Sequence, residues 1–381
     1  MPGHFYKNLS RSRSGYVRNK KKSMAMNTLY NFLPKDRSPN SVNAAVRQQI
    51  LDNWDHIAMP LDGMGVFRRI TAQIGGILED ANVDIQKKAV LVLCADNGIV
   101  EEGVSQTGQE VTRIVAEGMG RGQSTVCLMA NQIGARVIPV DAGINCTEAI
   151  PGILDRKIRC GSRNFLKQPA MTPQETTRAL RLGLELAADC KQQGYRILAT
   201  GEMGIGNTTT SSTVAAALLG EPPEVLIGRG AGLSDSGLFK KKQAAGTAIR
   251  KYHLYEQDAF TVLQIAGGYD LAALAGICMG GCLYRLPVVL DGVISMTAAL
   301  IAVRLLPETQ AFLIPSHLSR EPAAARLAEA LELQPVICAE MALGEGSGAV
   351  MMLSLLDMVL AVYSGLRTFA QADIAPYERF V

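Results

Sequence analysis

The sequence predicts an α/β protein built on a doubly wound, mainly parallel sheet. Short apolar and β-branched runs alternate along the chain with longer segments of helical periodicity, a pattern typical of strand–helix–strand units. Several of the apolar runs end in Gly, Asp, Glu or Ser, as expected where strands deliver residues to the ligand-binding edge of an open parallel sheet. Helical segments at both ends of the chain flank this alternating region.

The individual elements follow from these patterns in chain order. A helical region is predicted over 41–83, with Ser41 as its cap and Trp54 in the core. Further helices are predicted over 112–133, 173–193 and 236–250, and from Ala349 toward the C-terminus. The predicted strands are 89–95, 136–140, 196–200, 225–227, 287–290 and 311–314.

Six short polar motifs follow these strands or lie at their ends. Because the carboxyl ends of parallel strands meet at one edge of the sheet, the motifs predict a single large polar site there. The motifs are Ala-Asp-Asn-Gly at 95–98, Asp-Ala-Gly at 141–143, Gly-Glu-Met-Gly at 201–204, Gly-Arg-Gly at 228–230, Asp-Gly at 291–292 and Pro-Ser-His at 315–317.

Composition excludes several classes of protein. The chain has 381 residues, 48% of them hydrophobic and 19% charged, which is enough for a large core and too apolar for a disordered chain. Its most apolar stretches, 271–283 and 349–366, are interrupted by glycine and by Asp357, so no membrane span is predicted. Eight cysteines and four histidines lack metal-ligand spacing, so no metal is expected. With no secretory signal, we expect reduced thiols in the cytoplasm.

The N-terminal tail differs from the rest of the chain in charge. Residues 1–23 contain seven Lys or Arg side chains and no acidic ones, although the whole chain has a net charge of only +3. Such a tail could bind nucleic acid or serve as a transit peptide. The rest of the chain shows no basic stripe with interleaved aromatic residues, so a disordered tail and no nucleic-acid partner are predicted.

Residues 196–220 combine a strand, a glycine turn and a helix opened by Thr and Ser. Free N–H groups and the positive end of a helix dipole make such a junction an anion site, although a well-capped helix in an ordinary strand–helix unit is an equal alternative. A carboxylate repels a bound phosphate. Glu202, inside the turn, is therefore expected to face a part of the ligand that is or becomes cationic.

A second carboxylate, Glu345, stands in the glycine-rich sequence Leu-Gly-Glu-Gly-Ser-Gly-Ala at 343–349. Its position just before a long apolar helix fits two roles equally well. It is either a catalytic group in a loop or an acidic residue that complements the positive end of the following helix dipole.

Five motifs together resemble the nicotinate-nucleotide:dimethylbenzimidazole phosphoribosyltransferase family, which activates the lower ligand of cobalamin. They are GEMGIGNTT, LGEGSGA, ADNG, LDGVIS at 290–295 and IPSHLSREP at 314–322, and they follow the family order from about residue 40 onward. The resemblance implies a Rossmann-like catalytic domain over 88–320. It also implies a smaller helical domain formed by 40–87 with 321–381, and a homodimer.

The resemblance also implies a reaction. The family transfers the phosphoribosyl group of nicotinate mononucleotide to 5,6-dimethylbenzimidazole with inversion, and this chemistry needs neither a metal nor an organic cofactor. Glu345 matches the family position of the general base that removes a proton from the attacking base. Glu202 matches the carboxylate that opposes the developing positive charge on the ribosyl group.

The remaining site residues are carried over on the same motifs. Phosphate is expected near Gly204, Gly230 and Gly292 with Lys241, and Ser295 and Ser319 near ribose or phosphate. The acceptor slot is expected from 104–115, including Thr107, with Met203 and Leu343. His317 and His253 are expected to be structural, with no partner carboxylate.

Three departures from the family pattern leave the acceptor open. Asn97 stands where many members have histidine, residues 59–66 replace a commoner proline- and glycine-rich stretch, and Val115 replaces a polar residue of some members. The acceptor could therefore be another benzimidazole, adenine or a phenol. A non-catalytic nucleotide-binding protein is a further alternative, but it would have no reason to keep both Glu202 and Glu345.

Overall fold

Six parallel strands form one sheet at the centre of the molecule. The computed structural model describes residues 32–378, so the basic tail predicted over 1–23 lies outside the described residues. The strand order is β3-β2-β1-β4-β5-β6, which is the Rossmann order and confirms the predicted fold class. The strands are β1 Lys88–Ala95, β2 Arg136–Gly143, β3 Leu154–Asp155, β4 Ile197–Met203, β5 Val288–Leu290 and β6 Leu313–Pro315.

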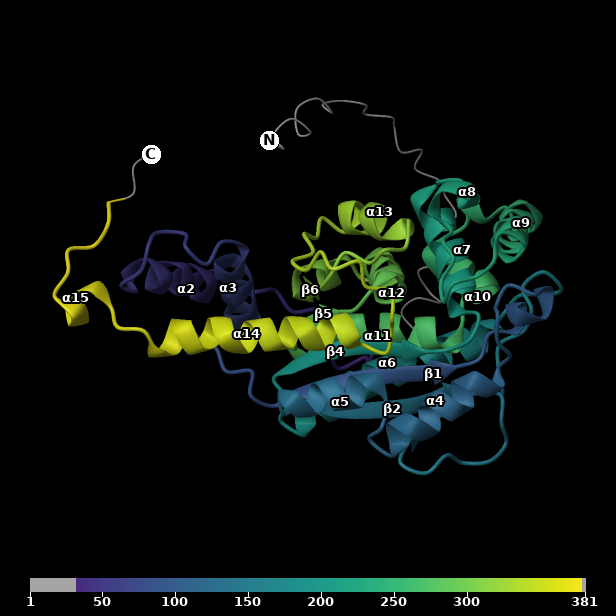
Figure 1. Cartoon of the computed structure of the whole chain (residues 1–381), viewed down its shortest axis with the longest axis horizontal. Coiled ribbons are helices and arrows are strands. Elements are labelled where there is room, and N and C mark those ends of the chain that lie inside the picture. Colours follow the sequence, from purple (N-terminus) through teal and green to yellow (C-terminus); the bar gives the residue numbers. More distant parts are fainter. Residues whose placement is uncertain (1–31, 379–381) are drawn as a thin grey trace.

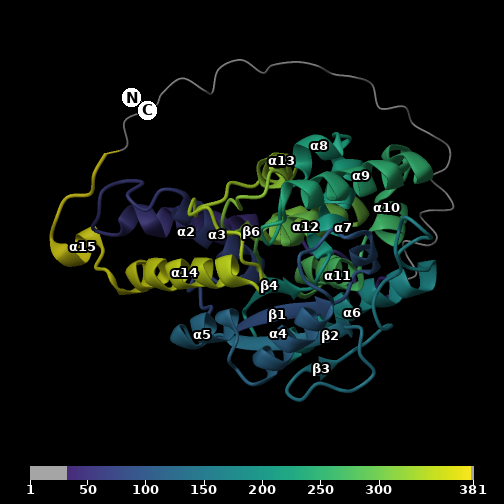
Figure 2. The same cartoon turned by 45° about the vertical axis from the view of Figure 1, so that its right-hand side comes forward.

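Helices cover both faces of this sheet (Figures 1 and 2). Leu91 and Leu93 of β1 pack toward α6, α11 and α12, whereas Val90 and Val92 pack toward α3, α5 and α14. This alternation follows from the two-residue period of a strand, and it buries β1 completely. The α-helices are α2 Ala44–His56, α3 Val66–Leu78, α4 Glu110–Gly120, α5 Thr125–Gln132, α6 Pro173–Gln192, α7 Asn207–Leu219, α8 Pro223–Leu226, α9 Asp235–Tyr252, α10 Ala259–Ala266, α11 Tyr269–Tyr284, α12 Val293–Leu305, α13 Ala323–Ala330, α14 Ser347–Gly365 and α15 Phe369–Ala372.

One predicted strand was wrong, and one short strand was missed. The run 225–227 falls within and just after α8, where Pro222 and Pro223 supply the fixed backbone angle that suits the first turn of a helix. A run of three apolar residues between proline and glycine does not distinguish a short strand from one helical turn. The two-residue strand β3 was not predicted because it is too short to produce a pattern.

Several helix boundaries also differ from the prediction. The single helix predicted over 112–133 is divided into α4 and α5, because Gly122 adopts a positive φ of 73° and Ser124 caps α5 through the N–H of Cys127. The first helix is capped by Asn43, which accepts the N–H of Val46 at 3.2 Å, and not by Ser41. Trp54 is buried, as predicted.

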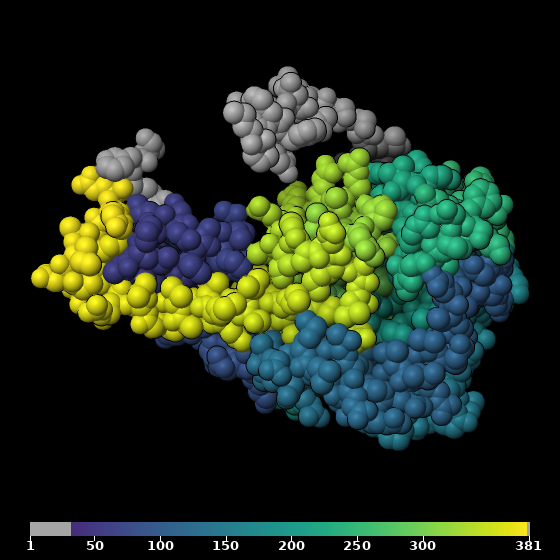
Figure 3. Space-filling model, viewed as in Figure 1, coloured from purple at the N-terminus to yellow at the C-terminus, as the bar shows by residue number. Residues whose placement is uncertain are grey.

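Segments from the two ends of the chain lie side by side. Figure 3 shows the purple segment that contains α2 and α3 packed against the yellow segment that contains α14. The rings of Trp54 and Tyr363 lie 5.0 Å apart there. Asn53 donates to the Tyr363 hydroxyl at 2.9 Å, and Ile57 forms a bridge with Thr368. The helix α13 instead contacts α12 and α7 above the sheet.

The helix α14 has one buried and one exposed apolar face. Asp357, which interrupts its apolar sequence, pairs with the buried Lys88 at 3.0 Å. Among the described residues, α14 is the one helix long and apolar enough to cross a membrane by length and composition, and 44% of its apolar window is buried in the protein. Met351 and Met358 lie two turns apart on the exposed face of α14, and 41% and 57% of their surfaces are exposed.

Replacement of Gly183 by alanine is expected to destabilise the fold. A Cβ atom at this position of α6 would lie 2.0 Å from the carbonyl oxygen of Ala273 and 2.6 Å from the nitrogen of Ile277, both in the backbone of α11. The two helices would have to separate, at a cost of about 1–3 kcal/mol. Urea denaturation measures the change. Gly118→Ala is the control, because a Cβ there meets open space and is expected to stabilise α4 slightly. If Gly118→Ala lowered the free energy of unfolding as much as Gly183→Ala, the close packing of α6 against α11 would be contradicted.

Candidate active site

A pocket lies at the carboxyl edge of the sheet, where the sequence predicted a ligand site. Its cavity has a volume of about 360 Å³, in the range of small-molecule sites. The segments that follow β4, β5 and β6 line it, together with the loop before α4 and the loop before α14. The motifs at 95–98 and 141–143 do not line the pocket, so only four of the six predicted strand ends converge on it.

Most of the predicted site residues lie in the wall of this pocket. Lys241 does not line it, and instead lies directly behind Thr208, which does. The predicted residues that line the pocket are Thr107, Glu202, Met203, Gly204, Gly230, Gly292, Ser295, Ser319, Leu343 and Glu345.

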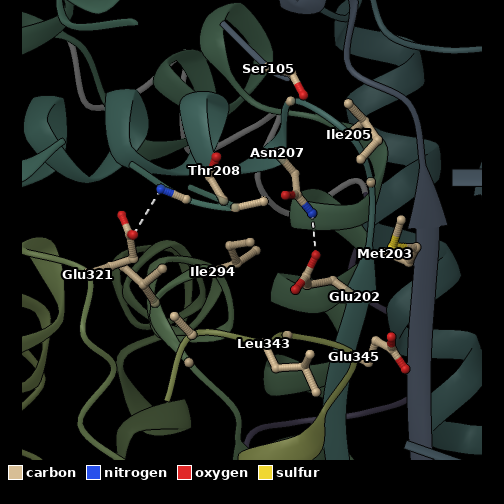
Figure 4. Close-up of a pocket in the computed structure, with 18 of the residues that line it drawn as sticks. Ser105, Glu202, Met203, Ile205, Asn207, Thr208, Ile294, Glu321, Leu343 and Glu345 are labelled. Atoms are coloured by element: carbon tan, nitrogen blue, oxygen red, sulfur yellow. Dashed lines mark hydrogen bonds between the residues drawn. The ribbon is translucent and has the colours of Figure 1, made fainter. Parts of the chain in front are cut away.

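Glu202 is a buried carboxylate of the pocket wall. It belongs to the strand β4 and is not in the turn after it, and only 7% of its surface is exposed. Figure 4 shows the carboxylate of Glu202 directed toward the amide of Asn207, which donates a hydrogen bond to its Oε2. Burial raises the pKa of Glu202 to about 8 despite that hydrogen bond, and the carboxylates of Asp270, Asp291 and Glu345 also raise it.

Glu345 lies beside Glu202 but its side chain points elsewhere. Its N–H donates to the carbonyl oxygen of Glu202 at 3.2 Å, so the two chain segments are joined. In Figure 4 the carboxylate of Glu345 is directed away from Glu202, and its Oε2 accepts the N–H of Val126 at 3.2 Å, in the first turn of α5. A helix N-terminus is a favourable place for a carboxylate.

The Glu345 loop has an unusual backbone. Gly344, Glu345 and Gly346 have φ values of 88°, 60° and 93°, a region that residues other than glycine rarely adopt. A Cβ at Gly201 would lie 2.4 Å from the carbonyl oxygen of Glu345, so a glycine in β4 is required for this approach. A strained glutamate held in this way is typical of a functional position.

Asp291 fixes the same loop from the other side. Its carboxylate accepts three backbone N–H groups, from Gly346 at 3.2 Å, Gly348 at 2.8 Å and Ala349 at 3.3 Å. These are N–H groups at the start of α14 that have no partner within the helix. Burial raises the pKa of Asp291 to about 6, although these hydrogen bonds lower it.

The end of the pocket at Gly230 and Lys241 is already hydrogen-bonded. The N–H of Gly230 donates to Oε1 of Glu321 at 2.9 Å, and Nζ of Lys241 donates to Oγ1 of Thr208 at 2.8 Å. Burial lowers the pKa of Lys241 to about 8, although the charge of Glu321 raises it. The hydroxyl of Ser319 donates to the carbonyl oxygen of Met341 at 3.3 Å.

The opposite end of the pocket is apolar. Val104 is buried, Leu343 is exposed, and Val115 lines the pocket from α4. The hydroxyl groups of Ser105 and Thr107 border this apolar part. Together these side chains form a slot suited to a flat, largely apolar ring. Its apolar lining consists of Val104, Val111, Val115, Met203, Ile205 and Leu343.

Comparison with known proteins identifies the family. A family model described as Phosphoribosyltransferase matches residues 40–374. The chain is 39% identical over 341 residues to nicotinate-nucleotide–dimethylbenzimidazole phosphoribosyltransferase of Ruminiclostridium cellulolyticum, covering 90% of this chain and 97% of the relative. The relative of that name from Clostridium acetobutylicum is 38% identical over 339 residues, covering 89% and 96% of the two chains.

Solved structures agree with the sequence relatives. The crystal structure of CobT from Thermus thermophilus superposes with a TM-score of 0.83 at 36% identity, covering 87% of this chain and 100% of that chain. The chain belongs to the nicotinate-nucleotide–dimethylbenzimidazole phosphoribosyltransferase family. The resemblance stated from the five motifs is therefore confirmed, and the protein is a phosphoribosyltransferase.

Of the three departures from the family pattern, only one lies in the pocket of this phosphoribosyltransferase. Val115 lines the slot, whereas Asn97 is buried outside the pocket lining and residues 59–66 form the turn before α3 and its first residue. His317 was expected to have no partner carboxylate, which was wrong. Its Nδ1 lies 3.9 Å from Oδ1 of Asp291, its ring lines the pocket, and burial lowers its pKa. His253 ends α9 with a positive φ of 50° and does not line the pocket.

Sequence reasoning missed three polar residues of the phosphoribosyltransferase site. Asn207 and Asp291 stand inside quoted motifs, but their hydrogen bonds depend on segments distant in sequence. Asp270 belongs to no motif. A signal for it exists, because no other charged residue stands between it and Arg285 in an apolar helix. Among residues 32–378, no group of three or more His, Cys, Asp or Glu side chains is arranged to hold a metal ion.

The unliganded phosphoribosyltransferase is expected to lose stability as the pH rises from 6 to 8. The folded-state pKa of Glu202 is about 8, above its unfolded value, so its contribution is complete at low pH and is lost as the pH rises through 8. One such group contributes a slope of about 1.4 kcal/mol per pH unit. Urea denaturation of the wild type and of Glu202→Gln at both pH values tests this. The variant should show the smaller loss. If the wild type and Glu202→Gln lost the same stability between pH 6 and 8, Glu202 would not be the group responsible. Glu340→Gln, at an exposed position, is the control and should lose as much stability as the wild type.

Proposed function

We propose that this enzyme transfers the 5-phosphoribosyl group of nicotinate mononucleotide to 5,6-dimethylbenzimidazole or a related lower-ligand base. The products are the α-ribazole 5′-phosphate and nicotinate, so the transfer serves cobalamin nucleotide-loop synthesis. One observation carries the proposal. Two carboxylates from different segments, Glu202 and Glu345, are joined through their backbones at one pocket that also holds an apolar slot.

The donor half of the reaction depends on Glu202. The bond between C1′ and the pyridinium nitrogen breaks, and both electrons stay with nicotinate, which leaves without a general acid. C1′ then carries positive charge that an ionised carboxylate stabilises electrostatically. Entry of the cationic pyridinium favours the charged form of Glu202, whose pKa of about 8 keeps it largely protonated in the empty pocket at neutral pH.

The acceptor half depends on Glu345. One ring nitrogen of the benzimidazole attacks C1′ from the side opposite the leaving group, which inverts the riboside from β to α. The other ring nitrogen must lose its proton, and Glu345 accepts it as general base. This requires the carboxylate to turn from the N–H of Val126 toward the slot, a rotation about its side-chain torsions.

The polar end of the pocket is the proposed phosphate site. Gly230, Gly292 and Ser319 line it, and Lys241 lies behind Thr208 with a buried ammonium group. Phosphate binding requires the N–H of Gly230 to exchange its partner Glu321 for a phosphate oxygen. We also assign Gly204 to the phosphate and Ser295 to the ribose or the phosphate, with Met203, Thr107 and Leu343 around the acceptor.

Product analysis tests the proposal. The enzyme is incubated with nicotinate mononucleotide and one acceptor from a panel of benzimidazoles, adenine and phenols, and released nicotinate is quantified with the riboside phosphate. We expect dimethylbenzimidazole to be the best acceptor, because its methyl groups fill the apolar lining, whereas the adenine amine would lose hydrogen bonds to water there. Absence of nicotinate release with every acceptor would overturn the enzymatic proposal in favour of a non-catalytic nucleotide-binding protein.

We also propose a cytoplasmic homodimer, in which one catalytic domain over 88–320 and one helical domain from 40–87 and 321–381 form each subunit. The exposed face of α14 supports the homodimer, since the apolar side chains of Met351 and Met358 lie on it two helical turns apart. A second copy of the same face would bury these side chains.

Met358→Glu is expected to convert the dimer into a monomer in light scattering after gel filtration. The control is Val225→Glu, which places the same charge on an apolar residue that is 54% exposed on α8, away from α14. A dimer in both variants would refute the α14 interface, and a monomeric wild type would refute the homodimer.

A further inference from the structure

The amide of Asn207 bridges two buried carboxylates. Its Nδ2 donates one hydrogen bond to Oε2 of Glu202 and one to Oδ2 of Asp270, the latter at 3.2 Å. Asn207 is 4% exposed and opens α7, and Figure 4 shows its side chain directed at Glu202. An amide nitrogen carries two hydrogens, so both are used and none remains for a ligand.

Asp270 cannot itself contact a substrate. It is fully buried in the first turn of α11 and does not line the pocket. Its Oδ1 accepts the N–H of Leu271 at 2.9 Å, and its Oδ2 accepts from Asn207. The backbone of Gly204 separates it from the cavity. A Cβ at that glycine would lie 3.0 Å from Oδ2 of Asp270 and 2.2 Å from the carbonyl oxygen of Ala95.

Several acidic groups surround this bridge. Among residues 32–378, no Lys, Arg or His forms an ion pair with Glu202 or Asp270. Burial raises the pKa of Asp270 to about 6 and that of Glu202 to about 8. The titratable groups that face the two carboxylates from the packed elements are Cys94 in β1, Asp96 after β1, Asp291 after β5 and Glu345 before α14.

We propose that Asn207 and Asp270 are positioning residues of the phosphoribosyl transfer, an inference that rests on the proposed function. Asn207 fixes the direction of the Glu202 carboxylate toward the reaction centre. Asp270 acts through Asn207 and adds a second negative charge behind it. The positive charge that this pair complements belongs to the ligand, first as the pyridinium of the donor and then as the ribosyl group in the transition state.

A proton balance follows from this arrangement. Glu202 holds a proton in the empty pocket at neutral pH and releases it to solvent when the cationic donor enters. Removal of the Asp270 charge makes Glu202 easier to ionise. A smaller fraction of the free enzyme then carries that proton, so donor binding releases fewer protons. Asp270 then no longer holds the Asn207 amide as firmly, so the Glu202 carboxylate is less well oriented. We therefore expect kcat to fall while the KM for the acceptor stays the same.

The test combines kinetics with a proton count. Asp270→Asn is expected to lower kcat about 10-fold and Asn207→Ala about 100-fold, the range of a misplaced catalytic group. In both, the acceptor KM should stay within about 2-fold of the wild type. The acidic limb of kcat/KM for nicotinate mononucleotide should move to lower pH in Asp270→Asn. Calorimetry of nicotinate mononucleotide binding in two buffers of different ionisation enthalpy gives the number of protons released, which should fall in that variant.

Controls separate this proposal from the proposed function and from misfolding. Thr209→Val alters a buried hydroxyl two residues from Asn207 on α7 and should leave the pH profile and the proton count unchanged. If Asp270→Asn does not fold, Asp270→Ala is measured in its place, because it removes the charge without introducing a second amide. A wild type that releases nicotinate, with variants that keep its pH profile and proton count, would overturn only the positioning roles. A wild type that releases none would overturn the proposed function itself.

Discussion

Glu345→Gln is expected to lower kcat by about 10²- to 10⁴-fold while the protein keeps its fold. Glutamine has the same shape, and its Oε1 can still accept the N–H of Val126, so the loop conformation is preserved. It cannot accept a proton from the acceptor base, and this step contributes the stated range in general-base catalysis. Initial rates of nicotinate release at saturating substrate concentrations measure the effect.

The matched control for this prediction is Glu340→Gln. Glu340 precedes the same loop, is exposed, and also has a positive φ of 51°, so the substitution repeats the chemical change outside the pocket. It should leave kcat unchanged. Turnover by Glu345→Gln within a few-fold of the wild type would exclude Glu345 as the base. His317, which lines the pocket beside the carboxylate of Asp291, would then be the candidate base.

Asp291→Ala is expected to destabilise the enzyme by about 3 kcal/mol. The substitution removes the acceptor of three N–H groups at the start of α14, and each buried N–H left without a partner costs about 1 kcal/mol or more. Activity should fall as well, because the loop that carries Glu345 ends at the same three groups. Thermal unfolding and initial rates on the same preparation measure both effects.

Asp291→Asn distinguishes hydrogen bonding from charge at this position. Asparagine keeps one oxygen, which can accept the N–H groups of Gly348 and Ala349, and loses only the bond from Gly346. Its loss of stability should therefore be about a third of that in Asp291→Ala. Equal losses would show that the negative charge, and not the set of acceptors, stabilises the start of α14.

The sheet was predictable because buried strands leave a local signal. The run 89–95 contains only apolar residues, and the structure confirms it as the central strand β1. The division between α4 and α5 was not predictable from periodicity, which continues across Gly122 at the turn. The short strand β3 depends on its pairing with β2, a contact that no local pattern encodes.

The candidate site shows the same division between local and long-range information. Glu202 and Glu345 stand out because a carboxylate among glycines has no simple helical explanation, and both line the pocket. Asp270 is 63 residues from Asn207 in sequence, so their hydrogen bond depends on the tertiary packing of α11. The hydrogen bond from the N–H of Gly230 to the carboxylate of Glu321, 91 residues away in sequence, likewise depends on tertiary packing.

The helix α14 connects the chemistry to the outermost part of the subunit. N–H groups in its first turn donate hydrogen bonds to Asp291, and Tyr363 near its C-terminal end packs against Trp54 of α2. A helix of 19 residues spans about 28 Å, so a tilt of about 2° at one end displaces the other by about 1 Å. An error of that size in a catalytic group lowers a rate about 100-fold. Substitutions in the helices that pack against the far end of α14 are therefore expected to be tolerated only where they leave the tilt of α14 unchanged, although these helices do not contact the substrate.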